Sequence, residues 1–162
     1  MAAVGAIAVV GMVAVADGAA AGEVLFGVGY EDVRGEHDAQ SAAGWLELRS
    51  DPFYTLGPVE LRGGLAGEAT TDASFWGGGG LVATVPLGSG FRFEGSVMAG
   101  LYEEGDGVDL GDTVEFRSQI GISYAVADRT RLGVAFEHKS NAGLSDRNPG
   151  VETLFVSVIR SF

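Results

Sequence analysis

Apolar and polar residues alternate along most of the chain from Val24 onward. In the stretch that begins at Phe91, apolar side chains stand at every second position and polar ones fill the positions between. A period of two is typical of a β-strand, because successive side chains of a strand point to opposite faces. The alternation predicts strands at 24–33, 42–49, 59–68, 75–85, 91–101, 114–126, 130–140 and 151–162.

These segments are close to the roughly 9 to 11 residues of a tilted membrane strand, and their even number allows a sheet to close on itself. The connections alternate in character. We expect acidic, glycine-rich extracellular links at 34–41, 67–74, 103–112 and 141–150, and periplasmic turns at 87–90 and 127–129. The link at 50–57 is longer than expected for a periplasmic turn. The predicted fold is all-β, an eight-stranded antiparallel transmembrane β-barrel.

The polar face of these strands carries charges of both signs. Glutamates stand two residues from arginines on the same face, at Glu47, Glu60, Glu94, Glu115 and Glu137 and at Arg49, Arg62, Arg92, Arg117 and, more distantly, Arg131. A barrel of this size has room for side chains but not for a water channel, so we expect a salt-bridged plug. A soluble ligand-carrying barrel would have apolar residues inside instead, and the period of two does not distinguish the two.

Composition narrows the function classes. The chain has 162 residues, enough for one domain, and 27 of them are glycines placed within apolar stretches, which suits tightly curved β-structure. It has no cysteine, so disulfides, thiolate metal sites and a thiol nucleophile are excluded. A net charge of −12 argues against a nucleic-acid partner, because phosphate binding needs clustered Lys and Arg.

The two ends of the chain suggest export. Residues 1–16 are uncharged, and Ala19, Ala20 and Ala21 form a small-residue cleavage pattern, so we expect a signal peptide at 1–21 and a barrel at 22–162. No basic residue precedes the apolar run. The terminal Phe162 follows apolar residues at alternate positions and resembles the recognition strand used by outer-membrane assembly machinery. Arg160 interrupts that pattern, and near the membrane interface its side chain can reach the polar boundary.

Polar residues on the lipid-facing side of the last two strands are the candidate chemistry. His138 and Ser140 continue the outward set of Phe136, while Glu152 shares the outward parity of Leu154. If Phe136 lies near Leu154 in an antiparallel pair, His138 lies near Glu152. A polar group facing lipid finds no water to bind, so this arrangement is costly unless it serves a function. Nucleophile, base and orienting carboxylate are what acyl transfer requires.

Each of these residues alone has an ordinary structural interpretation. A histidine at a strand end is usually an interfacial polar residue. Asn141 and Gly143 alone would be ordinary loop residues. Their joint occurrence favours catalysis. His37 lies in the first acidic link, where we expect no catalytic role. The glycine run 77–80 is not a phosphate-binding loop, because neither a Lys-Ser/Thr pair nor a helix follows it.

The segment from Phe136 to Gly143, followed by 148–152, resembles the signature of lipid A 3-O-deacylases of the PagL type, H-x-S-N-x-G and then N-x-G-x-E ending twelve residues after the serine. The resemblance covers the final quarter of the chain. It implies an eight-stranded outer-membrane barrel with a triad of His138, Ser140 and Glu152. It also implies that Asn141 and Gly143 help to form the oxyanion hole, with Asn148 supporting the site.

The implied activity is hydrolysis of the ester-linked 3-hydroxyacyl chain at the 3-position of lipid A, with no metal or organic cofactor. The expected partners are lipopolysaccharide, the bacterial outer membrane and its assembly machinery, and the chain is expected as a monomer or a homodimer. Two alternatives remain at this point. One is a non-enzymatic barrel of adhesin or structural type, and the other is a lipid A acyltransferase that hands the acyl group to an acceptor other than water.

Overall fold

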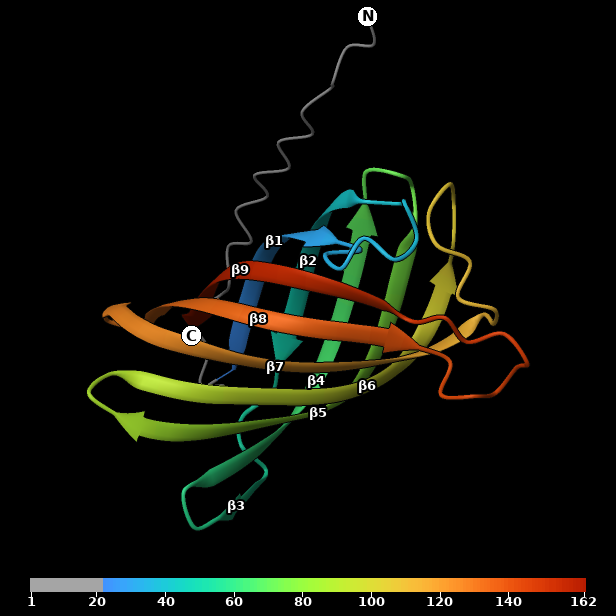
Figure 1. The fold of residues 1–162 in the computed structure, drawn as a ribbon. Coiled ribbons are helices and arrows are strands. Elements are labelled where there is room, and N and C mark those ends of the chain that lie inside the picture. Colours follow the sequence, from blue (N-terminus) through green and yellow to red (C-terminus); the bar gives the residue numbers. More distant parts are fainter. Residues whose placement is uncertain (1–21) are drawn as a thin grey trace, which may run out of the picture.

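The chain folds into a closed antiparallel β-barrel (Figure 1). A computed structural model describes residues 22–162, and the expected signal peptide at 1–21 lies outside them. The strands are β1 (Glu23–Glu31), β2 (Ser41–Arg49), β3 (Tyr54–Leu56), β4 (Val59–Thr70), β5 (Phe75–Gly88), β6 (Phe91–Glu103), β7 (Val114–Ala127), β8 (Thr130–Ser140) and β9 (Val151–Ser161). Within residues 22–162, no helix is long and apolar enough to cross a membrane.

All strands except β3 form the barrel wall. Sequence neighbours pair antiparallel from β4 to β9, β9 pairs with β1, and β1 pairs with β2. The ring closes where β2 pairs with β4, with Ala43 opposite Thr70 and Arg49 opposite Gly64. Every wall strand therefore has two neighbours, so the wall leaves no unpaired sheet edge facing the hydrocarbon core of a membrane. The predicted eight-stranded antiparallel barrel is confirmed.

β4, β5 and β6 run two or three residues beyond their predicted ends, and two further differences have a clear local cause. β1 ends at Glu31 rather than at 33, because Asp32 takes a positive φ of 52° and its carboxylate accepts backbone N–H groups of the residues that follow. The long link at 50–58 contains β3, which forms a small hairpin with β4 in which Tyr54 lies opposite Leu61. This added hairpin accounts for the unexpected length of the link.

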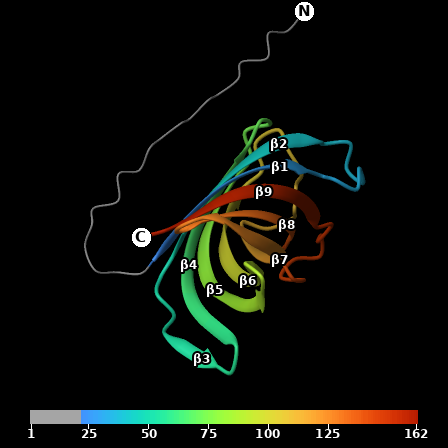
Figure 2. The ribbon, with the colours of Figure 1, turned by 90° about the vertical axis from the view of Figure 1, so that its left-hand side faces the viewer.

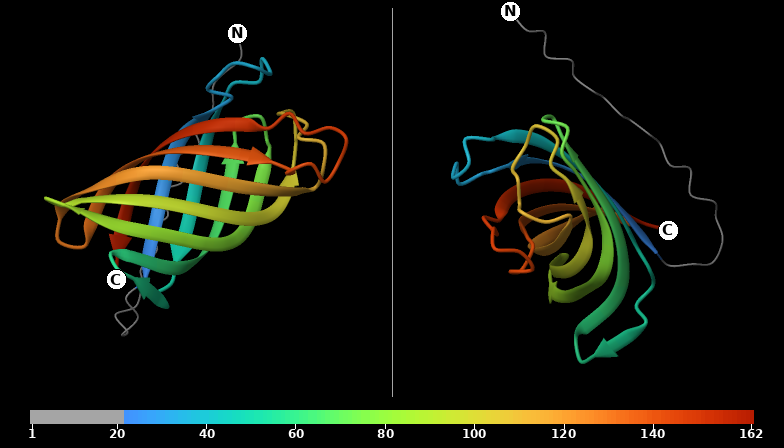
Figure 3. Two further views of the ribbon diagram at one scale, coloured as in Figure 1. Left: turned by 60° about the horizontal axis from the view of Figure 1, so that its bottom comes forward. Right: turned by 90° about the vertical axis from the view of Figure 1, so that its right-hand side faces the viewer.

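Links of two kinds stand at opposite ends of the barrel. The links 32–40, 71–74, 104–113 and 141–150 lie at one end, called here the loop end, which faces the viewer in the right panel of Figure 3. The tight turns at 89–90 and 128–129 lie at the other, the turn end, seen at the left of Figure 1 and toward the viewer in Figure 2. The acidic links expected from the sequence thus lie at one end of the barrel, and the short turns lie at the other.

Apolar side chains cover the outside of the wall. Leu65, Val97 and Ile120, on three different strands, are 66%, 61% and 58% exposed. Charged and polar side chains point inward and are buried, among them Glu47, Arg117 and Glu137. A soluble ligand-carrying barrel would show the reverse pattern. The structure therefore decides between the two barrel types and favours one surrounded by lipid.

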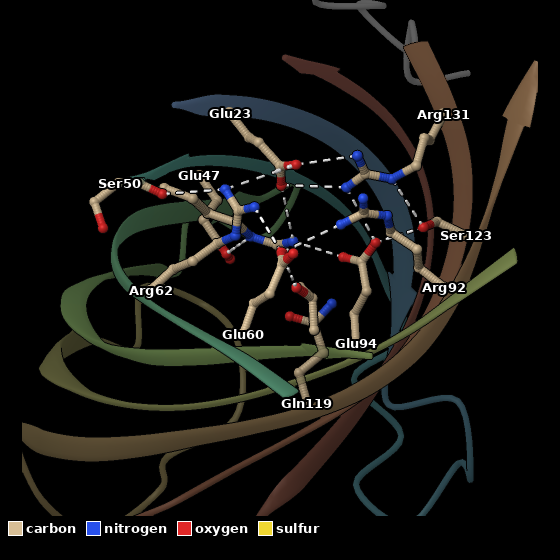
Figure 4. A network of polar contacts seen from close by, with 12 residues as sticks. Glu23, Glu47, Ser50, Glu60, Arg62, Arg92, Glu94, Gln119, Ser123 and Arg131 are labelled. Atoms are coloured by element: carbon tan, nitrogen blue, oxygen red, sulfur yellow. Dashed lines mark hydrogen bonds and ion pairs between the residues drawn. The ribbon is translucent and has the colours of Figure 1, made fainter. Parts of the chain in front are cut away.

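Ion pairs fill the interior. Arg49 Nη1 lies 2.6 Å from Glu94 Oε2, and Arg117 bridges Glu47 at 3.0 Å and Glu137 at 2.9 Å. Figure 4 shows the part of this network that joins β1, β2, β4, β6, β7 and β8. Its labelled members are Glu23, Glu47, Ser50, Glu60, Arg62, Arg92, Glu94, Gln119, Ser123 and Arg131. The predicted salt-bridged plug is present.

Aromatic rings complete the plug. The guanidinium of Arg117 lies 4.9 Å from the ring centre of Trp45 and 5.0 Å from that of Trp76, so cation–π contacts add to its ion pairs. A cavity of about 20 Å³ beside Trp45 and Arg49 has room for about one water molecule. The barrel interior is a packed core.

Lys139 is the cation of the interior nearest the loop end of β8. Its ammonium lies 2.8 Å from Glu31 of β1 and also contacts Glu68 of β4. All three side chains are at most 1% exposed. Because Lys139 stands between His138 and Ser140 in the sequence, its inward position fixes those two neighbours on the outer face.

Candidate active site

His138 and Glu152 form a hydrogen-bonded pair on the outer face near the loop end. They lie directly opposite each other in the β8–β9 pair, and His138 Nδ1 is 3.0 Å from Glu152 Oε1. An ionised carboxylate only accepts, so Nδ1 is the donor, and in the neutral imidazole Nε2 then carries the lone pair that a general base needs. The strand register predicted from Phe136 and Leu154 is confirmed.

Ser140 ends β8 two residues beyond His138 and lies on the same outward face, partly exposed. On a strand, two such positions are roughly 7 Å apart at the backbone. Among residues 22–162, Ser140 Oγ has no hydrogen-bond partner, and neither does His138 Nε2. Both atoms are therefore free to meet each other and a bound ester.

Gly150, in the loop that precedes β9, lies against the imidazole ring of His138. A Cβ at this position would lie 2.6 Å from His138 Cε1, so the ring would have to move, and the backbone has a φ of +72° that favours glycine. The backbone of Gly150 thus limits the position of the ring on one side, while the hydrogen bond to Glu152 fixes the direction in which Nδ1 points.

The β1–β2 loop also reaches this site. Arg34 Nη1 lies 3.3 Å from Glu152 Oε1, the same oxygen that bonds His138. His37 Nε2 donates to the carbonyl oxygen of Gly150 at 2.7 Å. Sequence reasoning placed His37 in this loop but missed both contacts, because nothing in the local pattern links residues more than a hundred positions apart.

Asn141 shapes the loop that follows the serine. Its side chain is fully buried, and Nδ2 donates to carbonyl oxygens of Leu110 at 2.9 Å and Arg147 at 2.7 Å. Its backbone N–H donates to Asn148 Oδ1 at 3.0 Å. The links 104–113 and 141–150 are therefore held side by side at the loop end, as Figure 3 shows.

A tight turn lies immediately beyond Ser140. The Leu144 N–H donates to Asn141 O, and the central residues Ala142 and Gly143 have φ values of +55° and +82°, as a type I′ turn requires. Gly143 N–H donates to Asn141 Oδ1 at 2.9 Å. The Ala142 N–H has no acceptor among residues 22–162. The structure thus brings the predicted Asn141, Gly143 and Asn148 together beside Ser140.

A groove of about 540 Å³ crosses the outer face from His138 toward β4. Outward-facing small residues, Ser118 of β7, Gly95 of β6 and Ala83 of β5, leave a hollow between larger apolar neighbours. The larger lining side chains are Phe136, Ile120, Val97, Leu81 and Leu61. Its volume is in the range of ligand-binding sites, and its lining suits an alkyl chain.

Within residues 22–162, no group of three or more His, Asp or Glu side chains is arranged to hold a metal ion. The site offers the hydroxyl of Ser140, the imidazole of His138 and the carboxylate of Glu152 on one face of the barrel. An apolar groove leads away from them.

Comparisons with known proteins identify relatives in sequence and in fold. The sequence model of the family described as lipid A 3-O-deacylase (PagL) matches residues 29–159. A curated relative, lipid A deacylase PagL of Bordetella bronchiseptica, is 26% identical over 77 residues, which span 46% of this chain and 43% of that protein. The aligned part is thus less than half of the relative's length.

Solved structures show the same fold. The crystal structure of the outer membrane enzyme PagL superposes with a TM-score of 0.65 at 19% identity, over 86% of this chain and 99% of that one. Neisserial surface protein A superposes with a TM-score of 0.58 at 13% identity, over 87% and 97%. The sequence match over residues 29–159 covers most of the barrel and includes His138, Ser140 and Glu152, so the chain belongs to the lipid A 3-O-deacylase (PagL) family.

Proposed function

We propose that this protein is an outer-membrane esterase that removes the ester-linked 3-hydroxyacyl chain from the 3-position of lipid A. The observation that carries the proposal is the 3.0 Å contact between His138 Nδ1 and Glu152 Oε1 on a lipid-facing wall, two residues from Ser140. Family membership supplies the substrate class, and the apolar outer face favours a site in contact with membrane lipid.

In the proposed mechanism Ser140 is the nucleophile and His138 the general base. His138 Nε2 takes the proton of Ser140 as Oγ attacks the ester carbonyl, and Glu152 stabilises the resulting imidazolium through Nδ1–H. The imidazolium then protonates the departing sugar oxygen. Water, activated by the same imidazole, releases the hydroxy fatty acid and restores Ser140. The Ser140–His138 hydrogen bond forms when substrate binds, as catalytic hydrogen bonds often tighten only in the complex.

The turn after the serine is proposed to stabilise the oxyanion. Ala142 N–H is free to donate, and Gly143 N–H can exchange its bond with Asn141 Oδ1 for one with the developing negative charge. Asn141 and Asn148 contribute by fixing the turn, since the buried Asn141 amide is bonded to its own loop and to Leu110.

The groove beside His138 is proposed to hold the acyl chain that is cleaved. It begins at the imidazole and continues over apolar side chains, so a chain lying in it places its ester end near Ser140. We also propose that the C-terminal strand β9 is what outer-membrane assembly machinery recognises. The proposed nucleophile, base and carboxylate all come from one copy of the chain.

The test is mass spectrometry of lipid A from membranes that contain the wild type or Ser140→Ala. Loss of one 3-linked hydroxyacyl chain and release of free hydroxy fatty acid are expected with the wild type only. A newly acylated lipid would instead identify an acyltransferase. No cleavage by a correctly folded wild type, across several lipid A forms, would favour a structural barrel.

A further inference from the structure

The β1–β2 loop carries an arginine, Arg34, that contacts the same Glu152 oxygen that bonds His138. We propose that Arg34 is a positioning residue that acts on the reaction through Glu152. The proposal rests on the function proposed above and adds a residue that lies outside the H-x-S-N-x-G motif.

Glu152 Oε1 is held by two donors. His138 Nδ1 approaches it to 3.0 Å and Arg34 Nη1 to 3.3 Å. The backbone of Glu152 is held as well, because Val33 N–H donates to its carbonyl oxygen at 3.2 Å. Among residues 22–162, Arg34 is the one Lys or Arg side chain in contact with this carboxylate. Without it, the carboxylate would keep only the imidazole as a partner.

The loop itself is built to hold Arg34 in place. The Asp32 carboxylate is buried and accepts the backbone N–H groups of Glu36 at 2.9 Å and His37 at 3.2 Å. His37 in turn bonds the Gly150 carbonyl oxygen. The loop therefore touches both groups that orient the His138 ring, namely the Gly150 backbone and the Glu152 carboxylate.

The shape of the guanidinium matters for this role. Arg34 Nη2 lies 2.6 Å from Glu36 Oε1 while Nη1 faces Glu152, so one planar group spans two carboxylates. A lysine ammonium carries the same charge but cannot present two donors in that fixed geometry. The Arg34 side chain is 57% exposed, so its effect is expected to be moderate.

The first experiment compares Arg34→Gln and Arg34→Lys with the wild type, using the full-length folded barrel and lipid A in mixed micelles. We expect kcat to fall about tenfold in Arg34→Gln, with KM within about twofold and partial recovery in Arg34→Lys. An arginine that instead binds a substrate phosphate would raise KM and leave kcat unchanged, and that result would overturn the proposal.

A double-mutant cycle asks whether Arg34 acts through Glu152. In a Glu152→Gln background, Arg34→Gln should cause little further loss, because the charged partner is already gone. The same tenfold loss in both backgrounds would refute the proposed route. Arg160→Gln is the matched control, since Arg160 is another exposed arginine, and its side chain contacts Thr130 and the carbonyl oxygen of Asp128 at the turn end, the end of the barrel opposite to the triad.

A reagent that does not depend on lipid A separates this proposal from the proposed function. A fluorophosphonate probe should label Ser140 in the wild type, and Arg34→Gln should slow the labelling about tenfold while Arg160→Gln leaves it unchanged. Labelling of Ser140 without cleavage of lipid A would reject the substrate but still test Arg34. Equal labelling rates in wild type and Arg34→Gln, or a wild type that is not labelled at Ser140, would overturn the positioning role.

Discussion

Gly150 lies against the edge of the His138 ring, so closely that a Cβ on the glycine would come within 2.6 Å of His138 Cε1. The same residue has a left-handed backbone and receives the hydrogen bond of His37. A position without a side chain is therefore part of what orients the proposed catalytic base.

Gly150→Ala should lower deacylation strongly while the barrel still folds. The new methyl group displaces the imidazole, and a displacement of about 1 Å at a catalytic group can cost roughly 100-fold in rate. Gly88→Ala is the control, because Gly88 has a similar φ of +87° but open space around the added Cβ. Lipid A turnover should be near normal in Gly88→Ala, and equal losses in the two variants would show that backbone strain rather than ring contact is responsible.

Glu152→Gln should keep more activity than Ser140→Ala. Glutamine can still accept a hydrogen bond from His138 Nδ1–H, but it cannot stabilise the imidazolium by charge. By analogy with serine proteases, the expected loss is roughly 10³- to 10⁴-fold, against about 10⁶-fold for loss of the nucleophile. Initial rates of hydroxy fatty acid release measure both, and indistinguishable rates would contradict the orienting role.

Gly95→Leu should restrict the acyl chains that the enzyme cleaves. A Cβ at this position meets only ordinary contacts at 3.8 Å, so the side chain fits and extends into the groove. Gly44→Leu adds the same group to the outer face of β2, away from the groove. Competition between lipid A forms with long and short 3-linked chains should show a shift toward short chains in Gly95→Leu alone. An unchanged preference would place the acyl chain elsewhere.

Lys139→Met should destabilise the barrel. Removing the ammonium leaves Glu31 and Glu68 buried together without their cation, and breaking a buried ion pair from one side costs roughly 3–5 kcal/mol. The temperature at which the folded band disappears in heat-modifiable gel electrophoresis should fall. Adding Glu68→Gln should recover part of the loss, whereas Arg160→Met, at an exposed position, should change little.

The barrel and the His138–Glu152 pair could be predicted because both depend on the period of two. Facing outward gave these residues their common face, and the condition that Phe136 lies opposite Leu154, which the structure bears out, places His138 opposite Glu152. The contact of Arg34 with Glu152 could not be predicted in this way, because it joins residues 118 positions apart through an irregular loop. The early end of β1 could not be predicted for a similar reason. It depends on the Asp32 carboxylate, which accepts hydrogen bonds from backbone N–H groups of the loop that follows.

The ion pairs of the interior join strands that are distant in the sequence: Lys139 of β8 meets Glu31 of β1 and Glu68 of β4, and Arg117 of β7 meets Glu47 of β2. An outward apolar residue touches mainly lipid, so it can be exchanged for another apolar residue almost independently of the rest of the chain. An inward charge can change only together with a partner on another strand. The two faces of each strand therefore tolerate substitution differently. A redesign of this barrel can vary its lipid-facing surface one residue at a time, but it must change interior charges together with their partners.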